Sequence, residues 1–97
     1  MEEEMSDLKK AAMKIVFMDS AKRWKNRKVV RAQVQATFPP PSESEMRMYN
    51  RANEHGGSGC MDAARAYGKR TGIDSCAGVL LQVGWMTTKG ALSLKAK

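Results

Sequence analysis

Residues Lys28–Phe38 read KVVRAQVQATF, a stretch in which apolar and polar residues alternate. The apolar positions are Val30, Ala32, Val34, Ala36 and Phe38. A period of two is typical of a β-strand with one buried face, because successive side chains of a strand point to opposite sides of the sheet. The pattern therefore predicts a strand that presents Arg31, Gln33 and Gln35 to solvent or to a ligand.

The segment before this strand is compatible with two structures. Ser6 is a good helix N-cap, and Ala12 and Ile15 share one helical face. The apolar run within residues 12–18 also fits a buried strand, since a short apolar run does not separate helix from strand by its period. We expect a short helix that leads into a strand, with residues 19–27 as the basic loop of a hairpin.

Helix signals dominate the chain after residues 39–41, three prolines that form a rigid spacer. Residues 42–45, Ser-Glu-Ser-Glu, match the capping box that starts a helix, and Gly56 is suited to end it. A second helix is expected from about Ser58 to Thr71, ending at Gly72. A third helix should follow, and residues 85–97 read as a hairpin or a tail.

Residues 64–81 resemble a helix-turn-helix motif, with Gly72 at the turn. The resemblance implies DNA binding through the second helix, which would enter the major groove. Thr71 and Gly78 stand where the motif usually has branched apolar residues. The second helix, residues 75–82, carries no Lys or Arg to contact bases.

Together these elements predict one small α+β domain that covers the whole chain. Its parts are an acidic leader (1–8), a basic helix and strand region with a hairpin (9–38), a proline spacer (39–41), a region of two to three short helices (42–84) and a C-terminal hairpin or tail (85–97). A chain of 97 residues has room for one hydrophobic core only.

Composition excludes several classes of protein. No run approaches the ~20 consecutive apolar residues of a membrane-spanning helix, and the chain starts with acidic residues rather than a secretory signal. We therefore expect a cytoplasmic protein, with Cys60 and Cys76 as thiols rather than a disulfide. One His and two isolated Cys do not form a metal site, and no catalytic set or cofactor motif is present. We expect no enzyme, no metal and no cofactor.

Positive charge is concentrated in the first third of the chain. Residues 9–36 contain nine Lys or Arg and one Asp, a net charge of +8, whereas the whole chain carries +7. Trp24 stands within this basic run and is either a core residue or a surface on which a base stacks. The predicted binding residues are Lys22, Arg23, Trp24, Lys25, Arg27, Lys28 and Arg31, with Arg65, Lys69 and Arg70 as a second patch.

Two functions are compatible with this basic surface. The first is a small non-catalytic protein that binds DNA or RNA, because Lys and Arg neutralise phosphates. The alternative is a protein-binding module, such as an inhibitor encoded by a phage or another mobile element, that docks on the acidic surface of a nucleic-acid-handling enzyme. Such docking favours an exposed apolar patch, for which Met46, Met48 and Tyr49 are the candidates. No membrane partner is expected.

Overall fold

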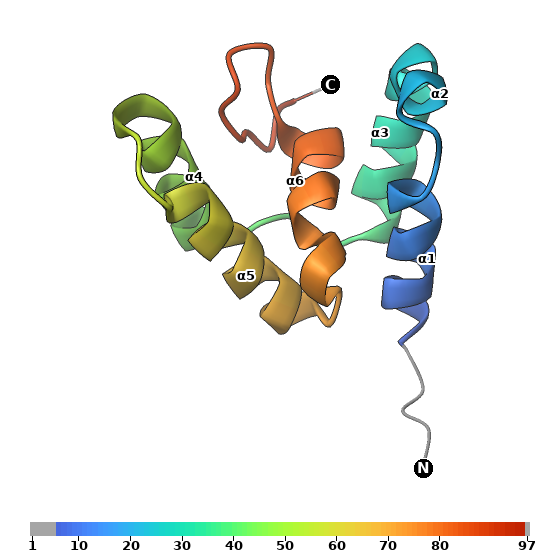
Figure 1. The fold of residues 1–97 in the computed structure, drawn as a ribbon, viewed down its shortest axis with the longest axis horizontal. Helices are drawn as coiled ribbons and strands as arrows, with labels where there is room; N and C mark the ends of the chain where they lie inside the picture. Colours follow the sequence, from blue (N-terminus) through green and yellow to red (C-terminus); the bar gives the residue numbers. More distant parts are fainter. Residues whose placement is uncertain (1–5, 97) are drawn as a thin grey trace.

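The computed structural model describes residues 6–96, and these residues form helices and loops (Figure 1). The elements are α1 (Asp7–Val16), α2 (Ser20–Lys25), α3 (Arg27–Thr37), α4 (Glu43–His55), α5 (Gly59–Thr71), the 3-10 turn η1 (Asp74–Cys76) and α6 (Ala77–Trp85). In Figure 1, α6 lies in the middle, with α4 and α5 on one side and α1, α2 and α3 on the other. Across residues 6–96 there is no strand and no sheet.

The predicted α+β class is therefore wrong, and the alternating stretch is the main reason. Residues 28–38 belong to α3 and its C-cap, in which Val30, Val34 and Phe38 are buried. Ala32 and Ala36, which would lie on the buried face of the predicted strand, are exposed in the helix. Every second position includes every fourth, so a period of two contains the i, i+4, i+8 face of a helix.

The first hairpin is also replaced by helices. Residues 12–18 are helical up to Val16, and the Ser6 hydroxyl accepts from the Lys9 amide at 3.1 Å to cap α1. The stretch predicted as a basic loop forms α2, which starts after the N-cap Asp19. The helix was thus the correct alternative for the N-terminal segment, and the strand was wrong.

The predicted starts and stops of the two central helices are confirmed. Ser42 accepts from the Glu45 amide at 3.1 Å, and the Glu45 carboxylate accepts from the Ser42 amide at 2.7 Å, which is the expected capping box. Gly56 ends α4 with φ of 81°, and Gly72 ends α5 in the left-handed conformation. These ends are local, because glycine adopts positive φ without steric cost.

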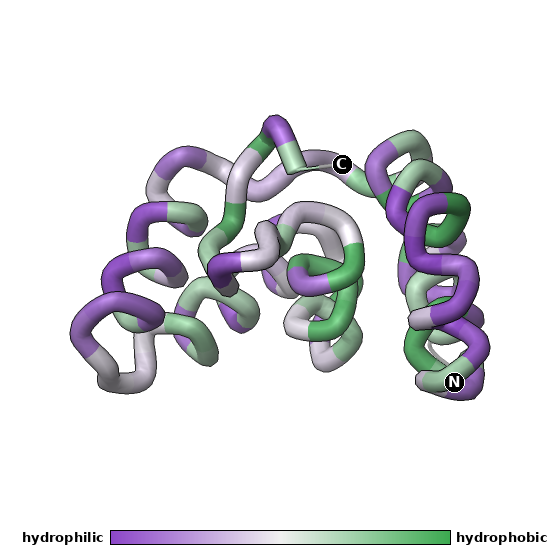
Figure 2. Tube along the Cα trace, turned by 90° about the horizontal axis from the view of Figure 1, so that it is seen from above, coloured by the Kyte–Doolittle hydropathy of each residue, from purple (hydrophilic) through white to green (hydrophobic). Residues whose placement is uncertain are grey.

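Helix α6 forms the centre of the core, with Leu80, Leu81 and Trp85 buried. Viewed from above, its hydrophobic part lies between the two outer groups of helices (Figure 2). A Cβ on Gly84 would stand 2.7 Å from Val34 of α3, so only glycine allows this close approach. The second helix of the resembled motif thus packs mainly into the core, and Gln82 is exposed on its other side.

The C-terminal segment folds back without forming a β-ladder. Met86 and Leu92 form one antiparallel bridge, and Gly90 takes φ of 86° in the turn between them. Asn50 of α4 accepts from the Leu92 amide at 2.7 Å and donates to its carbonyl at 3.0 Å. The expected C-terminal hairpin is present only as this single bridge, flanked by hydrogen bonds from the Ser93 amide to Trp85 and from the Thr87 amide to Ala91. The amide and carbonyl of Leu92 point away from Met86, which leaves them available to Asn50.

Glu45 of the Ser42–Glu45 capping box also connects α4 to α5. Glu45, which is 5% exposed, accepts from Arg70 Nε at 2.9 Å and from Arg70 Nη2 at 2.8 Å. Arg70 also donates to the Pro40 carbonyl at 3.0 Å and lies over the Tyr67 ring at 5.5 Å. Its hydrogen bonds hold the pKa of Glu45 below its ordinary value of 4.5 despite burial, and they raise the pKa of Arg70.

We expect Ser42→Ala to lower the free energy of unfolding by about 1 kcal/mol, because an amide at the start of α4 loses its acceptor. Urea denaturation followed by circular dichroism measures this loss. Ser44→Ala is the matched control, since Ser44 is exposed within α4. Equal midpoints for Ser42→Ala and the unmodified chain would contradict the role of the cap.

The Glu45–Arg70 pair predicts a loss of stability in acid. A carboxyl group with a lowered folded pKa stabilises the fold above its unfolded value of 4.5, and this contribution disappears as the pH falls through the folded pKa. We therefore expect Glu45→Gln to destabilise the protein at neutral pH, with the difference from the unmodified chain shrinking in acid. Glu43→Gln is the control, because the Glu43 side chain is 87% exposed. A difference that stays constant with pH would argue against this pair.

Candidate functional site

Helices α2 and α3 contain basic residues but no acidic ones. Between Ser20 and Ser42 the chain has six basic residues and no Asp or Glu. They are Lys22, Arg23, Lys25, Arg27, Lys28 and Arg31. We call the exposed part of this region, residues 22–28, the basic surface. Its field favours an anionic partner, because no carboxylate in the segment offsets it.

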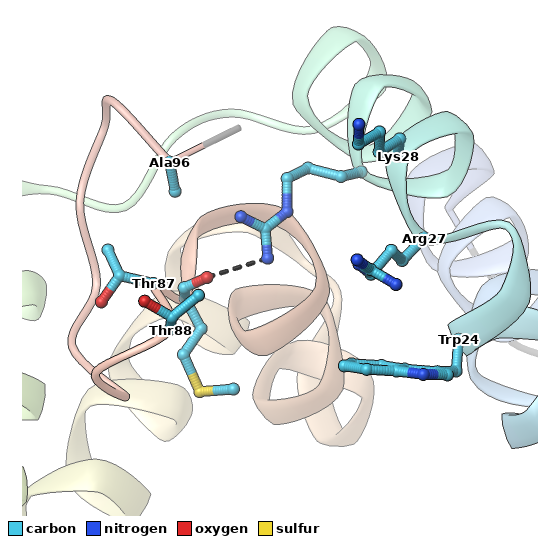
Figure 3. A pocket seen from close by; sticks show the side chains of 8 residues that line it. Trp24, Arg27, Lys28, Thr87, Thr88 and Ala96 are labelled. Carbon is cyan, nitrogen blue, oxygen red and sulfur yellow. Dashed lines mark hydrogen bonds between the residues drawn. The ribbon is translucent and has the colours of Figure 1, made fainter.

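A groove lies between this surface and the loop that follows α6 (Figure 3). It has a volume of about 610 Å³. The residues that line it are Trp24, Arg27, Lys28, Arg31, Met86, Thr87, Thr88 and Ala96. In Figure 3, Trp24, Arg27 and Lys28 stand on the α2–α3 side, and Thr87, Thr88 and Ala96 stand on the opposite side. The groove thus has a cationic, aromatic wall facing a wall with hydroxyl groups.

A second hollow of about 320 Å³ adjoins the groove along α6. It shares Trp24, Arg27, Arg31 and Met86 with the groove. Its further lining residues are Ser20, Arg23, Val79, Gln82 and Val83. The shared residues make one continuous concave region with Trp24 at the junction.

Trp24 is a surface residue, with 68% of its area exposed. This excludes the core alternative for its side chain. The guanidinium carbon of Arg27 lies 4.7 Å from the centroid of the indole ring. A cation over an exposed indole contributes about 0.5–1 kcal/mol, so the contact is weak enough to be exchanged for another partner of the ring.

Two of the predicted arginines bind backbone carbonyls at helix ends instead of facing solvent. Arg23 Nη1 donates to the carbonyls of Ile15 and Val16, both at 3.2 Å, and so caps the end of α1. Arg31 donates through Nε to the Val83 carbonyl at 2.9 Å and through Nη2 to the Met86 carbonyl at 2.8 Å. Cations at helix C-termini also complement the negative end of the helix dipole. These two residues build the groove rather than offering their charge freely.

Gln35, one helical turn after Arg31, connects α3 to the last turn of α6 and to Ala96. Its amide nitrogen donates to the Gly84 carbonyl at 2.6 Å and to the Ala96 carbonyl at 2.7 Å. Because Ala96 lines the groove, this amide positions one of its walls. The sequence indicated a polar face for Arg31 and Gln35, but that face meets α6 and the loop instead of a ligand.

The structure does not assemble the second predicted patch as one cationic surface. Arg70 is held by Glu45, and Arg65 lies 3.6 Å from Asp62 on the same helix. Lys69 is exposed, and it lines a hollow of about 510 Å³ together with Arg65 and Asp74. The carboxylate in that hollow makes it less suited to an anion than the groove on the other helices.

The remaining predicted residues stay on the surface. Lys22, Lys25, Arg27 and Lys28 are exposed, and the structure brings Arg27 and Lys28 to the groove. Sequence reasoning missed Met86, Thr87, Thr88 and Ala96. No local signal marks them, because they are more than fifty residues away in the chain from Arg27, Lys28 and Arg31 and reach the groove only through tertiary packing.

Other candidate sites can be described briefly. Of the apolar patch expected for protein docking, only Met48 is exposed, since Tyr49 is 6% exposed and Met46 is partly buried. Cys60 and Cys76 are free thiols. Residues 6–96 contain no cluster of three or more His, Cys, Asp or Glu side chains placed to hold a metal ion. In the same residues no helix is both long and apolar enough to span a membrane.

Comparisons with protein-family models, with curated proteins and with solved structures found no match to this chain.

We expect Gln35→Leu to loosen the loop of residues 86–96, because two carbonyls lose their donor while the side chain keeps a similar size. Leaving a buried carbonyl without a donor costs about 1–3 kcal/mol. Amide hydrogen exchange read by mass spectrometry should show faster exchange in this loop. Gln33→Leu, on the exposed side of α3, is the matched control. Unchanged exchange in Gln35→Leu would contradict its positioning role.

Proposed function

We propose that this protein binds nucleic acid through the basic surface and the adjoining groove, and that it does so without catalysing a reaction. The carrying observation is an exposed indole, Trp24, that lies between lysines and arginines and lines a groove. Cations that neutralise phosphates and an aromatic ring that stacks on bases are the two components of nucleic-acid sites that do not read a sequence.

The charge distribution supports this proposal. Lys22, Lys25 and Lys28 are exposed and form no hydrogen bond or ion pair through their side chains with any of residues 6–96. Among the described residues, the guanidinium of Arg27 lies over the Trp24 ring and forms no hydrogen bond or ion pair. These four exposed cations on two adjacent helices can therefore each meet a phosphate without breaking an ion pair to any of residues 6–96. Releasing counterions from those phosphates would supply the main part of the affinity.

An acidic protein surface is the second candidate partner, because the same cations would pair with carboxylates. Phe17 and Val29 favour it, since they are 76% and 70% exposed and nucleic-acid binding makes no use of them. In this case the protein would act as a docking module on a larger enzyme. A pull-down from a native host, with and without nuclease, separates the two candidates, because a protein partner would survive nuclease treatment.

We expect binding of fluorescein-labelled DNA to weaken steeply with salt. Each phosphate contact adds about 0.9 to the slope of log affinity against log salt for duplex DNA and about 0.7 for single strands. The triple variant Lys22→Ala, Lys25→Ala, Lys28→Ala should lower this slope by about two to three units if each lysine meets one phosphate. Fluorescence anisotropy between low and moderate salt measures the slope.

The charge-matched control is the triple variant Lys10→Ala, Lys69→Ala, Lys89→Ala, which removes three exposed lysines outside the basic surface. Its slope should stay close to that of the unmodified protein. An equal decrease in both triple variants would show that net charge alone drives binding. Absence of binding at low salt would refute the proposed function.

A further inference from the structure

The groove has features that discriminate between single-stranded and double-stranded nucleic acid. Trp24 is exposed, so its ring is accessible to an unpaired base, whereas bases inside a duplex are already stacked on one another. Arg27 covers one face of the indole at present. A base that replaces the guanidinium over the ring would make the larger contact, and the released guanidinium would be free to pair with a phosphate.

The two walls of the groove suit the two sides of a single nucleotide strand. Arg27 and Lys28 on one wall can hold the phosphates, with Trp24 beside them for the base. The hydroxyl groups of Thr87 and Thr88 on the facing wall form no hydrogen bond with any of residues 6–96, so they can donate to or accept from a sugar or a base edge. Such contacts require a strand whose base edges are open.

The same surface is poorly arranged for a duplex. A helix that reads a major groove presents polar side chains along its exposed face. The exposed cations of α3 are confined to its first turn, Arg27 and Lys28, and the exposed positions that follow carry no charge; they are Val29, Ala32, Gln33, Ala36 and Thr37. Helix α6 packs into the core through Leu80, Leu81 and Trp85 and carries no Lys or Arg that could meet a phosphate.

We propose that the groove takes a single strand of DNA or RNA, with one base stacked on Trp24 and the neighbouring phosphates held by Arg27 and Lys28. This inference rests on the proposed function and adds the class of nucleic acid and the site of the base. The residues that position the groove, Arg31 and Gln35, do so through carbonyls of α6 and of the C-terminal loop.

The test compares a labelled oligothymidylate of about 12 nucleotides with a duplex of the same length, since single-strand sites cover about 4–16 nucleotides. Trp24→Ala should weaken oligothymidylate binding by about 5- to 150-fold, the ratio that corresponds to the loss of one base–aromatic stack. The salt slope should stay unchanged, because stacking releases no counterions. Trp24→Phe should retain most of the affinity, since phenylalanine keeps a stacking face.

Two controls separate stacking from general surface effects. Phe17→Ala removes an aromatic residue that is also exposed but does not line the groove, and it should leave the affinity unchanged. Thr87→Val with Thr88→Val removes both hydroxyls while keeping the side-chain shape, and it should weaken oligothymidylate binding without altering the salt slope. Circular dichroism verifies that each variant is folded.

Iodide quenching of tryptophan fluorescence gives an independent measurement. The other tryptophan, Trp85, is 3% exposed, so iodide reports mainly on Trp24. Bound oligothymidylate should protect Trp24 from iodide, and this protection should be absent with the duplex at equal occupancy.

The outcomes distinguish this inference from the proposed function. The inference is supported if the protein binds the single strand more tightly than the duplex, if Trp24→Ala weakens single-strand binding, and if the bound strand protects Trp24 from iodide. Equal affinity for duplex and single strand, or a Trp24→Ala variant with unchanged affinity, would overturn it while leaving salt-dependent binding by the lysines intact. Absence of any binding at low salt would remove the proposed function together with this inference.

Discussion

The carbonyl groups at the C-terminal end of α6 need hydrogen-bond donors, and α3 supplies them. The last carbonyls of a helix have no partner within the helix, and an end that is buried without one is costly. Arg31 and Gln35, four residues apart on α3, donate to Val83, Gly84 and Met86. The same Gln35 reaches Ala96 at the end of the described chain. These bonds hold α3 against the central helix and place the loop that forms the far wall of the groove.

Three of the arginines predicted to bind a ligand serve the fold instead. Arg23 caps α1, Arg31 caps α6, and Arg70 joins the Glu45 carboxylate to the Pro40 carbonyl. Arginine suits these positions because its planar guanidinium has five donors and stays charged when partly buried. A count of basic residues therefore overestimates the cations that are free to meet a partner. The lysines, with compact and strongly hydrated ammonium groups, remain on the surface.

The proposed site depends on this difference between the arginines that hold the fold together and the basic residues that stay exposed. The structural arginines bring α2, α3 and the C-terminal loop together, and Arg27, Lys28 and Trp24 are left facing the groove that results. Trp24 is 68% exposed, and a guanidinium that a ligand can displace lies over its ring. In the proposed function, binding and fold would use different members of one basic segment, which allows substitutions to test them separately.

Local chemistry was sufficient to predict the features that depend on neighbouring residues. The capping box at residues 42–45, the glycine that ends α5 and the basic charge of residues 22–28 were all correct, because each depends on side chains and backbone within a few positions. Whether residues 28–38 form a strand or a helix was not decided by neighbouring residues. Their alternation fits a strand and a helix equally well, and the face that packs into the core is the helical one with Val30, Val34 and Phe38. The groove needed the tertiary structure most of all, since Arg31 bonds to carbonyls 52 and 55 residues away, a pairing that only the packing of α3 against α6 creates.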